Sequence, residues 1–310
     1  MGLRIIGCGS ALPEKVLTND DLALKVDTSD EWIRERTGIG QRHIASMGEN
    51  VATLGAEAGR KALKMAGVEA RDIDLILLAT CSFGDNTPSA ACRVQSILGA
   101  QNAAAFDIGA ACTGFLTALT VADAYLRTGA FNKILVIGSE TLSEIVDWED
   151  RTSCILFGDG AGAVVVTDDK KSDMIFTLGA DGNKADVLCC RKGDYVKMDG
   201  KEVYRFATTR VPECIEETLS KAGAIHEDIN MYLLHQANSR IIESVAKKLS
   251  EDMAKFPMNL ERVGNTSSAS IPVLLDELVR GGKIKNGMNL VLSGFGAGLN
   301  YGTCLIKWNI

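Results

Sequence analysis

The sequence contains an internal repeat, which limits the possible folds more than any other feature of the chain. When the chain is aligned with itself at an offset of 156 residues, Lys61–Ala79 lies over Glu217–His235, and seven of these nineteen positions are identical. Unrelated segments would share roughly one position by composition alone. Two further pairs of segments align, the second at an offset one residue shorter: Ile134–Gly138 with Leu290–Gly294, and Ile108–Cys112 with Val263–Ser267. The chain is therefore predicted to consist of two copies of one α/β unit.

Apolar runs of strand length alternate with longer segments of helical periodicity, which indicates a layered α/β architecture. The predicted strands are Leu75–Thr80, Ile134–Ile137, Ala163–Thr167, Met231–Leu234, Leu290–Leu292 and Thr303–Ile306. The predicted helices are Val51–Gly67, Gly114–Gly129, Val211–Gly223, Ser239–Leu249 and Ile271–Gly281. Each half has ordinary domain size. We expect one half at residues 1–168 and the other at 169–310, joined by the charged segment 167–173.

Bulk properties exclude several classes of protein. No apolar run approaches the roughly 18 residues that span a bilayer, and the N-terminal segment does not resemble a secretory signal. The nine cysteines are scattered without a C-x-x-C pair, which is typical of a reduced, cytoplasmic protein. The net charge of −7 argues against general nucleic-acid binding.

Three side chains suited to covalent catalysis each follow a predicted strand. Cys112 lies where a short strand passes into a helix, and the free N–H groups of a helix start favour a thiolate nucleophile. His235 ends the apolar run at 231–234, and Asn265 lies in a serine-rich turn. Taken singly, each could be structural: a buried thiol, a hydrogen-bonded imidazole or a turn amide. Because the repeat brings all three to strand ends of related halves, we expect them to share one cleft.

Each half ends in a glycine-rich stretch that leads into a strand, at 157–166 and 294–306. Neither is a phosphate-binding loop, because no Gly-Lys-Ser/Thr follows and no G-x-G-x-x-G opens a helix. Glycines allow either close packing of backbones or exposure of N–H groups to a ligand. For Phe295–Gly298 both interpretations stay open, and for Gly158–Gly162 close packing is favoured.

Long motifs cover essentially the whole chain in a fixed order. They are DEWIRERTGI at Asp30–Ile39, ACTGF at Ala111–Phe115, DWEDRTSCILFGDGAGAVV at Asp147–Val165, HQAN at His235–Asn238 and GNTSSAS at Gly264–Ser270. On these motifs the chain resembles the β-ketoacyl-acyl-carrier-protein synthase III enzymes of the thiolase-like condensing superfamily. The resemblance implies a five-layered αβαβα core built from two duplicated α/β halves, and a homodimer. Asn265 separates this group from condensing enzymes that use a cysteine and two histidines.

The resemblance implies an acyltransferase that starts type II fatty acid biosynthesis. Cys112 is expected to take the acyl group of an acyl-CoA primer, and the N–H groups of Cys112 and Ala297 to hold the oxyanion. Relatives usually have glycine at the position of Ala297. His235 and Asn265 are expected to donate hydrogen bonds while malonyl-acyl-carrier-protein loses CO₂, giving a 3-oxoacyl thioester. No metal or redox cofactor is expected, because CoA thioester is a substrate.

The resemblance also assigns binding residues. Trp32 and Arg151 are expected to sandwich the adenine of CoA, with Thr28, Arg36 and Asn238 along the pyrophosphate and pantetheine. An acidic carrier protein needs a basic surface. The expected docking residues are Arg205, Gln236, Arg240, Lys247 and Lys248; a solvated helix face is the alternative interpretation of the basic helix.

Primer choice and pathway stay open at this stage. Many relatives place a bulky phenylalanine, contributed across the dimer, where this chain has Thr87, so we expect primers longer than acetyl to fit. The alternatives are a related synthase of secondary metabolism, a synthase with CoA-bound acceptors and a catalytically silent binding subunit. A papain-like hydrolase shares the order Cys, His, Asn but lacks the duplicated frame.

Overall fold

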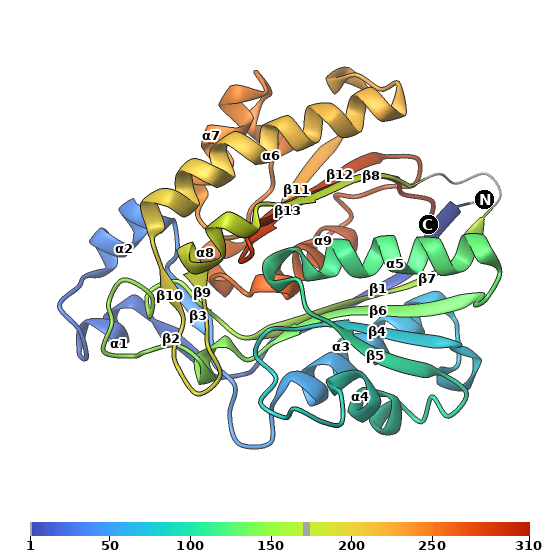
Figure 1. The fold of residues 1–310 in the computed structure, drawn as a ribbon, viewed down its shortest axis with the longest axis horizontal. Coiled ribbons are helices and arrows are strands. Elements are labelled where there is room, and N and C mark those ends of the chain that lie inside the picture. The colour runs from blue at the N-terminus through green and yellow to red at the C-terminus, as the bar shows by residue number, and fades with distance from the viewer. Residues whose placement is uncertain (1, 170–173) are drawn as a thin grey trace.

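The computed structural model describes residues 2–169 and 174–310, and two β-sheets organise them. The sheets lie one above the other with helices between them and helices on both outer faces (Figure 1). This arrangement confirms the predicted αβαβα layering. The predicted connection at 167–173 lies partly outside the described residues, so the division at 168/169 stays a prediction.

The first sheet has the strand order β1-β7-β6-β4-β5. Its strands are β1 (Gly2–Ala11), β4 (Leu75–Ala79), β5 (Ala104–Ile108), β6 (Lys133–Glu140) and β7 (Gly160–Asp169). β4 runs parallel to β5 and β6, whereas β7 is antiparallel to β6 and β1. Every residue of β4 is buried, because helices cover both faces of the sheet, and this explains its uninterrupted apolar sequence.

The second sheet repeats this pattern in the order β8-β13-β12-β11. Its strands are β8 (Ile175–Ala180), β11 (Met231–Leu234), β12 (Asn289–Gly296) and β13 (Asn300–Lys307). β11 is parallel to β12, and the other pairs are antiparallel, as in the first sheet. At the offset of 156 residues, the counterpart of β5 is not a strand but the short helix α8 (Leu260–Val263).

The helices fall into three layers. The outer layer of the first sheet is α3 (Val51–Ala66) and α4 (Ala90–Leu98); the central layer is α5 (Gly114–Thr128) and α9 (Ser270–Arg280); the outer layer of the second sheet is α6 (Gly200–Ala222) and α7 (Ser239–Lys248). An apolar cluster between the sheets joins the halves, since it contains residues of α5, α9 and both sheets. Among the described residues, no helix is both long and apolar enough to cross a membrane.

Shorter elements lie beside these layers and were not predicted. They are β2 (Val16–Thr18), α1 (Asn19–Ala23), α2 (Asp30–Thr37), β3 (Gln41–His43), β9 (Leu188–Cys189) and β10 (Lys197–Met198). β2 pairs with β3, and β9 pairs with β10. In Figure 1 they gather at one end of the two sheets, on the side where α2 and α7 meet.

One predicted helix is longer in the structure. The sequence predicts a start at Val211, but α6 begins at Gly200 and passes through Pro212. Pro212 has no N–H to donate to the carbonyl of Thr208. Lys248 Nζ donates to that carbonyl instead, at 2.8 Å. A side chain of α7 therefore compensates for the proline inside α6.

Candidate active site

Cys112 lies in a single 3₁₀ turn, η2 (Ala111–Thr113), between β5 and α5. Ala111 has a φ of 44°, and the corresponding turn of the second half, η7 (Ser267–Ala269), begins with Ser267 at a φ of 47°. The offset between the two turns is thus 156 residues, as it is between β4 and β11 and between β6 and β12. The shorter offset predicted for this segment is wrong, and the counterpart of Cys112 is Ser268.

Burial raises the pKa of the Cys112 thiol to about 12. The expected thiolate is therefore not the resting state. The helix proper begins only at Gly114, two residues after Cys112, and desolvation outweighs the contacts that favour the thiolate. The end of β12 passes directly behind the turn: a Cβ at Gly296 would lie 2.8 Å from the backbone nitrogen of Cys112.

His235 follows β11 and is buried. Its Nδ1 lies 2.7 Å from Ser270 Oγ, and the same oxygen accepts a hydrogen bond from the backbone N–H of Gln236 at 3.4 Å. A Ser270 hydroxyl that donates to Nδ1 places the proton of a neutral imidazole on Nε2, whereas one that accepts from Nδ1 leaves Nε2 free. Burial lowers the pKa of His235 to about 3. The ring is therefore neutral, and in the first of these tautomers it donates from Nε2.

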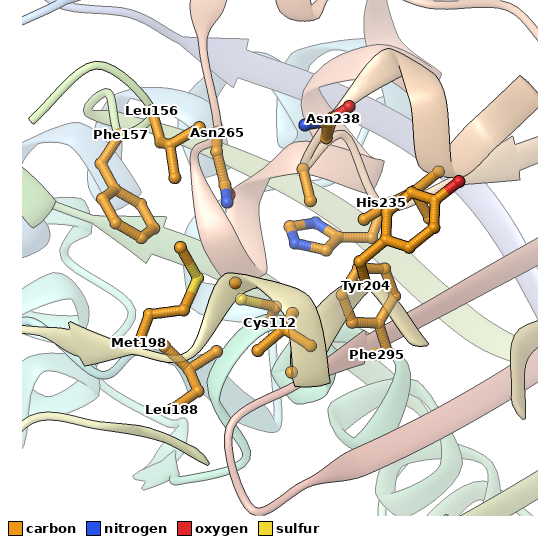
Figure 2. Close-up of a pocket in the computed structure, with 15 residues that line it drawn as sticks. Cys112, Leu156, Phe157, Leu188, Met198, Tyr204, His235, Asn238, Asn265 and Phe295 are labelled. Atoms are coloured by element: carbon orange, nitrogen blue, oxygen red, sulfur yellow. The ribbon is translucent and has the colours of Figure 1, made fainter. Parts of the chain in front are cut away.

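Asn265 lies between α8 and η7, where it forms an isolated parallel bridge with Phe157. Its Oδ1 accepts a hydrogen bond from the backbone N–H of Ser267 at 2.9 Å. Because the carbonyl oxygen is engaged there, the side-chain nitrogen turns toward the cavity, as Figure 2 shows. Asn265 is thus also oriented as a donor.

Cys112, His235 and Asn265 line one cavity (Figure 2). Asn238 lies at the same cavity, and its apolar walls include Leu156, Phe157, Met198, Val203, Tyr204 and Phe295. A second cavity shares Cys112, Phe157 and Leu188 with the first and is lined as well by Ala297, Cys81, Leu142, Ile145 and Val196. The nucleophile therefore lines two adjacent cavities.

Sequence reasoning missed several of these residues. Met198, Val203 and Tyr204 come from β10 and the start of α6, where no chemical motif marks them. Ser270 could have been found, because it is the last residue of the GNTSSAS motif and directly precedes the predicted helix at 271–281.

A cluster of aromatic and basic side chains lies on α2 and the loop at 147–157. The guanidinium of Arg151 is 5.0 Å from the Trp32 ring centroid, and that of Arg36 is 5.6 Å from it. Arg151 also donates to the carbonyl of Asp27 at 2.6 Å. Thr28 is adjacent, but its hydroxyl is buried without a hydrogen-bond partner among the described residues. We call Trp32, Arg36 and Arg151 the clamp.

Asn238 connects the clamp to the cavity. It caps the N-terminus of α7 by accepting from the N–H of Arg240 at 2.9 Å, and its side-chain nitrogen donates to the carbonyl of Arg36 at 3.0 Å. The same side chain lines the cavity that contains Cys112. A continuous path of polar contacts therefore runs from α2 to the cavity.

The predicted docking residues divide into two groups. Arg205, Arg240, Lys247 and Lys248 are exposed, although Arg205 is paired with Glu202 at 2.7 Å and Lys248 is engaged by the carbonyl of Thr208. Gln236 does not belong to this surface. It is fully buried, because its amide donates to the carbonyl of Leu234 and accepts from the N–H of Asn259.

Thr87, the predicted primer-pocket residue, is exposed and lines neither cavity of its own chain. Its expected role across a dimer stays a prediction. Within residues 2–169 and 174–310, no group of three or more His, Cys, Asp or Glu side chains is placed to hold a metal ion.

The layered duplicated fold, with Cys112, His235 and Asn265 at one cavity, defines a condensing enzyme of the thiolase-like class, an acyltransferase. Residues 106–182 match the family model of 3-oxoacyl-[acyl-carrier-protein] synthase III, and residues 219–308 match the model of its C-terminal part. The chain belongs to the 3-oxoacyl-[acyl-carrier-protein] synthase III family.

Named relatives agree with this assignment. The chain is 48% identical to a β-ketoacyl-[acyl-carrier-protein] synthase III of Synechococcus sp. WH7803, over 99% of this chain and 96% of the relative. The solved 3-oxoacyl-[acyl-carrier-protein] synthase III of Aquifex aeolicus VF5 superposes with a TM-score of 0.97 at 44% identity, covering 99% and 100% of the two chains. The priming β-ketosynthase of the R1128 polyketide pathway has a TM-score of 0.94 at 35% identity, covering 99% and 96%.

Proposed function

We propose that this protein condenses an acyl-CoA primer with malonyl-acyl-carrier-protein, as the first condensation of type II fatty acid biosynthesis. The observation that carries the proposal is that Cys112 lines two adjacent cavities, one of which also contains the two donors His235 and Asn265. One cavity suits the acyl chain on sulfur. The other suits the pantetheine arm that CoA and carrier protein share.

In the first stage the acyl group moves from CoA to Cys112. The Cys112 Sγ–acyl bond forms as the CoA sulfur–acyl bond breaks, and the thiol proton ends on the CoA sulfur. Because Ser270 Oγ can donate or accept, it also supports the His235 tautomer whose free Nε2 can relay this proton. The N–H groups of Cys112 and Ala297 hold the tetrahedral oxyanion, an interaction that typically contributes ~10²–10³ in rate.

In the second stage malonyl-carrier-protein loses CO₂. The thioester oxygen gains negative charge, which His235 Nε2–H and the Asn265 amide stabilise as neutral donors. The resulting carbanion attacks the acyl carbon. Cys112 then departs as a thiolate and takes up a proton. Each step uses side chains and backbone groups of the chain, so the proposal includes neither a metal nor a redox cofactor.

Partner binding follows the same geometry. Adenine is expected to enter between Trp32 and Arg151, displacing the guanidinium from its present position over the ring. Arg240 and Lys247, with Arg205 nearby on α6, form the proposed dock for an acidic carrier protein. A homodimer is proposed through β5, the edge strand of the first sheet, where Phe106 is 37% exposed.

The test is the intact mass of wild type and Cys112→Ser after incubation with acetyl-CoA and longer acyl-CoAs. We expect an acyl adduct on wild type alone, and the range of adducts measures the primer range that Thr87 permits. A folded wild-type protein that acquires no adduct from any acyl-CoA would be a silent binding subunit.

Priming of polyketide synthesis is the second candidate, because a priming β-ketosynthase shares this fold at 35% identity. The two candidates share the chemistry and differ in the carrier protein. Comparing kcat/KM for malonyl groups on fatty-acid and polyketide carrier proteins separates them, with the higher value identifying the pathway.

A further inference from the structure

Arg42 is a buried arginine that the proposed chemistry does not use. It lies in β3 and is 0% exposed. Its Nη1 donates to the carbonyl of Leu17 at 3.2 Å and to Asn19 Oδ1 at 2.8 Å, and its Nη2 donates to the carbonyl of Ile155 at 2.7 Å. A buried guanidinium is costly unless hydrogen-bonded. These acceptors therefore fix both the guanidinium and the segments that supply them.

One arm of this network leads to α2. Asn19 is fully buried, and its side-chain nitrogen donates to Asp30 Oδ1 at 2.8 Å and to the carbonyl of Ile39 at 2.7 Å. Asp30 is the first residue of α2, and Ile39 lies just beyond its end. Arg42 thus holds both ends of the helix that carries Trp32, through a single amide.

A second arm leads to the other side of the clamp. Ile155 follows Arg151 in the loop at 147–157, and its carbonyl receives the bond from Arg42 Nη2. Trp32 and Arg151, which lie 5.0 Å apart as ring centroid and guanidinium carbon, are therefore tied to the same buried side chain from opposite sides.

A third contact leads to the catalytic amide. A Cβ at Gly264 would lie 3.1 Å from Arg42 Cβ, and one at Gly158 would lie 3.0 Å from it. These two glycines flank the bridge in which Asn265 N donates to the carbonyl of Leu156 at 2.9 Å and Gly158 N donates to that of Asn265 at 3.0 Å. The stem of Arg42 therefore packs against the backbone that sets the place of Asn265.

We propose that Arg42 is a positioning residue that couples the clamp to Asn265. One rigid group then sets both the nucleotide end of the substrate site and the donor used in decarboxylation. The coupling stands on contacts of the free chain, whereas its consequence for catalysis rests on the proposed function.

Two variants separate the contacts of Arg42 with α2 from its other contacts. Arg42→Lys keeps the charge but loses the planar fork that reaches several acceptors at once. Asn19→Ala removes the amide that joins Arg42 to α2 and leaves the bonds from Arg42 to the carbonyls of Leu17 and Ile155. Arg34→Lys is the matched control, because Arg34 lies on α2 and makes exposed ion pairs with Asp30 and Glu261, which contribute little.

Hydrogen exchange of the free protein tests the coupling without any activity. We expect Arg42→Lys, which loses the bond to the carbonyl of Ile155, to speed exchange in residues 28–40 and 153–159. Exchange should also rise in 263–267, because Asn265 N donates to the carbonyl of the adjacent Leu156. Asn19→Ala should act on 28–40 alone, and Arg34→Lys on none of these segments. Uniformly faster exchange in Arg42→Lys would indicate general destabilisation and overturn the proposal. So would unchanged exchange at 263–267.

Kinetics then test the consequence. For Asn19→Ala, KM for acyl-CoA in Cys112 acylation should rise about tenfold, with kcat for malonyl decarboxylation within about twofold of wild type. For Arg42→Lys, KM should rise similarly and decarboxylation should fall about tenfold. If Asn19→Ala and Arg42→Lys lowered decarboxylation equally, the contacts from Arg42 to α2 and to the Asn265 backbone would not act separately, and the proposal would be refuted. Wild type that binds CoA without being acylated would refute the proposed function, while CoA affinity would still measure the effect of Arg42 on the clamp.

Discussion

The two halves of the molecule share a frame and differ at one edge. Four strands of each sheet correspond in order, and two of these pairs, β4 with β11 and β6 with β12, lie at the offset of 156 residues. In each half a 3₁₀ turn whose first residue is left-handed leads into the central helix. In the first half β5 leads to that turn, whereas in the second half α8 replaces the strand. The replacement frees Asn265, the counterpart of Gly109, to bridge to Phe157 of the first half.

The residues facing the two turns also differ. Glu140, at the end of β6, accepts a hydrogen bond from Ser268 Oγ at 2.8 Å, which fixes the turn of the second half. Its counterpart at the end of β12 is Gly296, which lies against Cys112 and leaves space around the thiol. The two halves thus differ at their 3₁₀ turns. The carboxylate of Glu140 holds the turn of the second half by a hydrogen bond, whereas Gly296, at the equivalent position, leaves the turn of Cys112 free to react.

The largest expected effects come from variants that separate the acylation of Cys112 from the decarboxylation of the malonyl group. Cys112→Ser should abolish acylation, lowering condensation by ~10³-fold or more, while leaving malonyl decarboxylation measurable. His235→Ala and Asn265→Ala should lower decarboxylation by ~10²–10³-fold, because each removes a donor to the enolate. Acyl-adduct mass and CO₂ release measure the two steps separately; loss of acylation in Asn265→Ala would contradict the assignment.

Giving the reactive turn a side chain should impair it. Gly296→Ala places a methyl group 2.8 Å from the nitrogen of Cys112, so the turn must shift and acylation should slow by about 10²-fold. Gly182→Ala, where no atom lies within 4 Å of the new Cβ, is the matched control. Rapid CoA release from Gly296→Ala, measured in a single turnover, would show that the turn tolerates the shift.

The protonation state of Cys112 has its own pH signature. With a thiol pKa of about 12, the thiolate fraction of the free protein should rise about tenfold per pH unit, with no plateau between pH 7 and 10. Alkylation of the Cys112 peptide by iodoacetamide, followed by mass, measures this rate. A plateau below pH 9, as for a small free thiol, would restore the thiolate interpretation.

The smallest expected effect concerns the outer helices. α3 is regular, with Ala56 where α6 has Pro212, so only α6 needs the bond from Lys248 to Thr208. Lys248→Met should lower the free energy of unfolding by about 1 kcal/mol and Tm by about 2 °C. Lys247→Met should leave both unchanged. Equal Tm values for Lys248→Met and Lys247→Met would contradict the role of Lys248 in compensating for Pro212.

The sequence predicted most of the frame, since its signals are local. β4 and β11 are continuous apolar runs, and α7 has Ile241, Ile242 and Val245 at helical spacing, all of them buried. It did not predict β1 or β8, and it placed the start of α6 at Val211, too late, before the proline that the helix passes through. The reason α6 continues lies on another helix.

The amino-acid sequence by itself determined the duplicated α/β class, the offset of its halves and the residue types at the site. Only the tertiary structure decided how those residues act. It holds Cys112 as a thiol by burial, turns the nitrogen of Asn265 toward the cavity, and directs Gln236 inward rather than to the surface. It also joins Arg42 to Ile155. Desolvation and hydrogen bonding depend on groups brought together from both halves of the chain, so no local pattern of residues reports them.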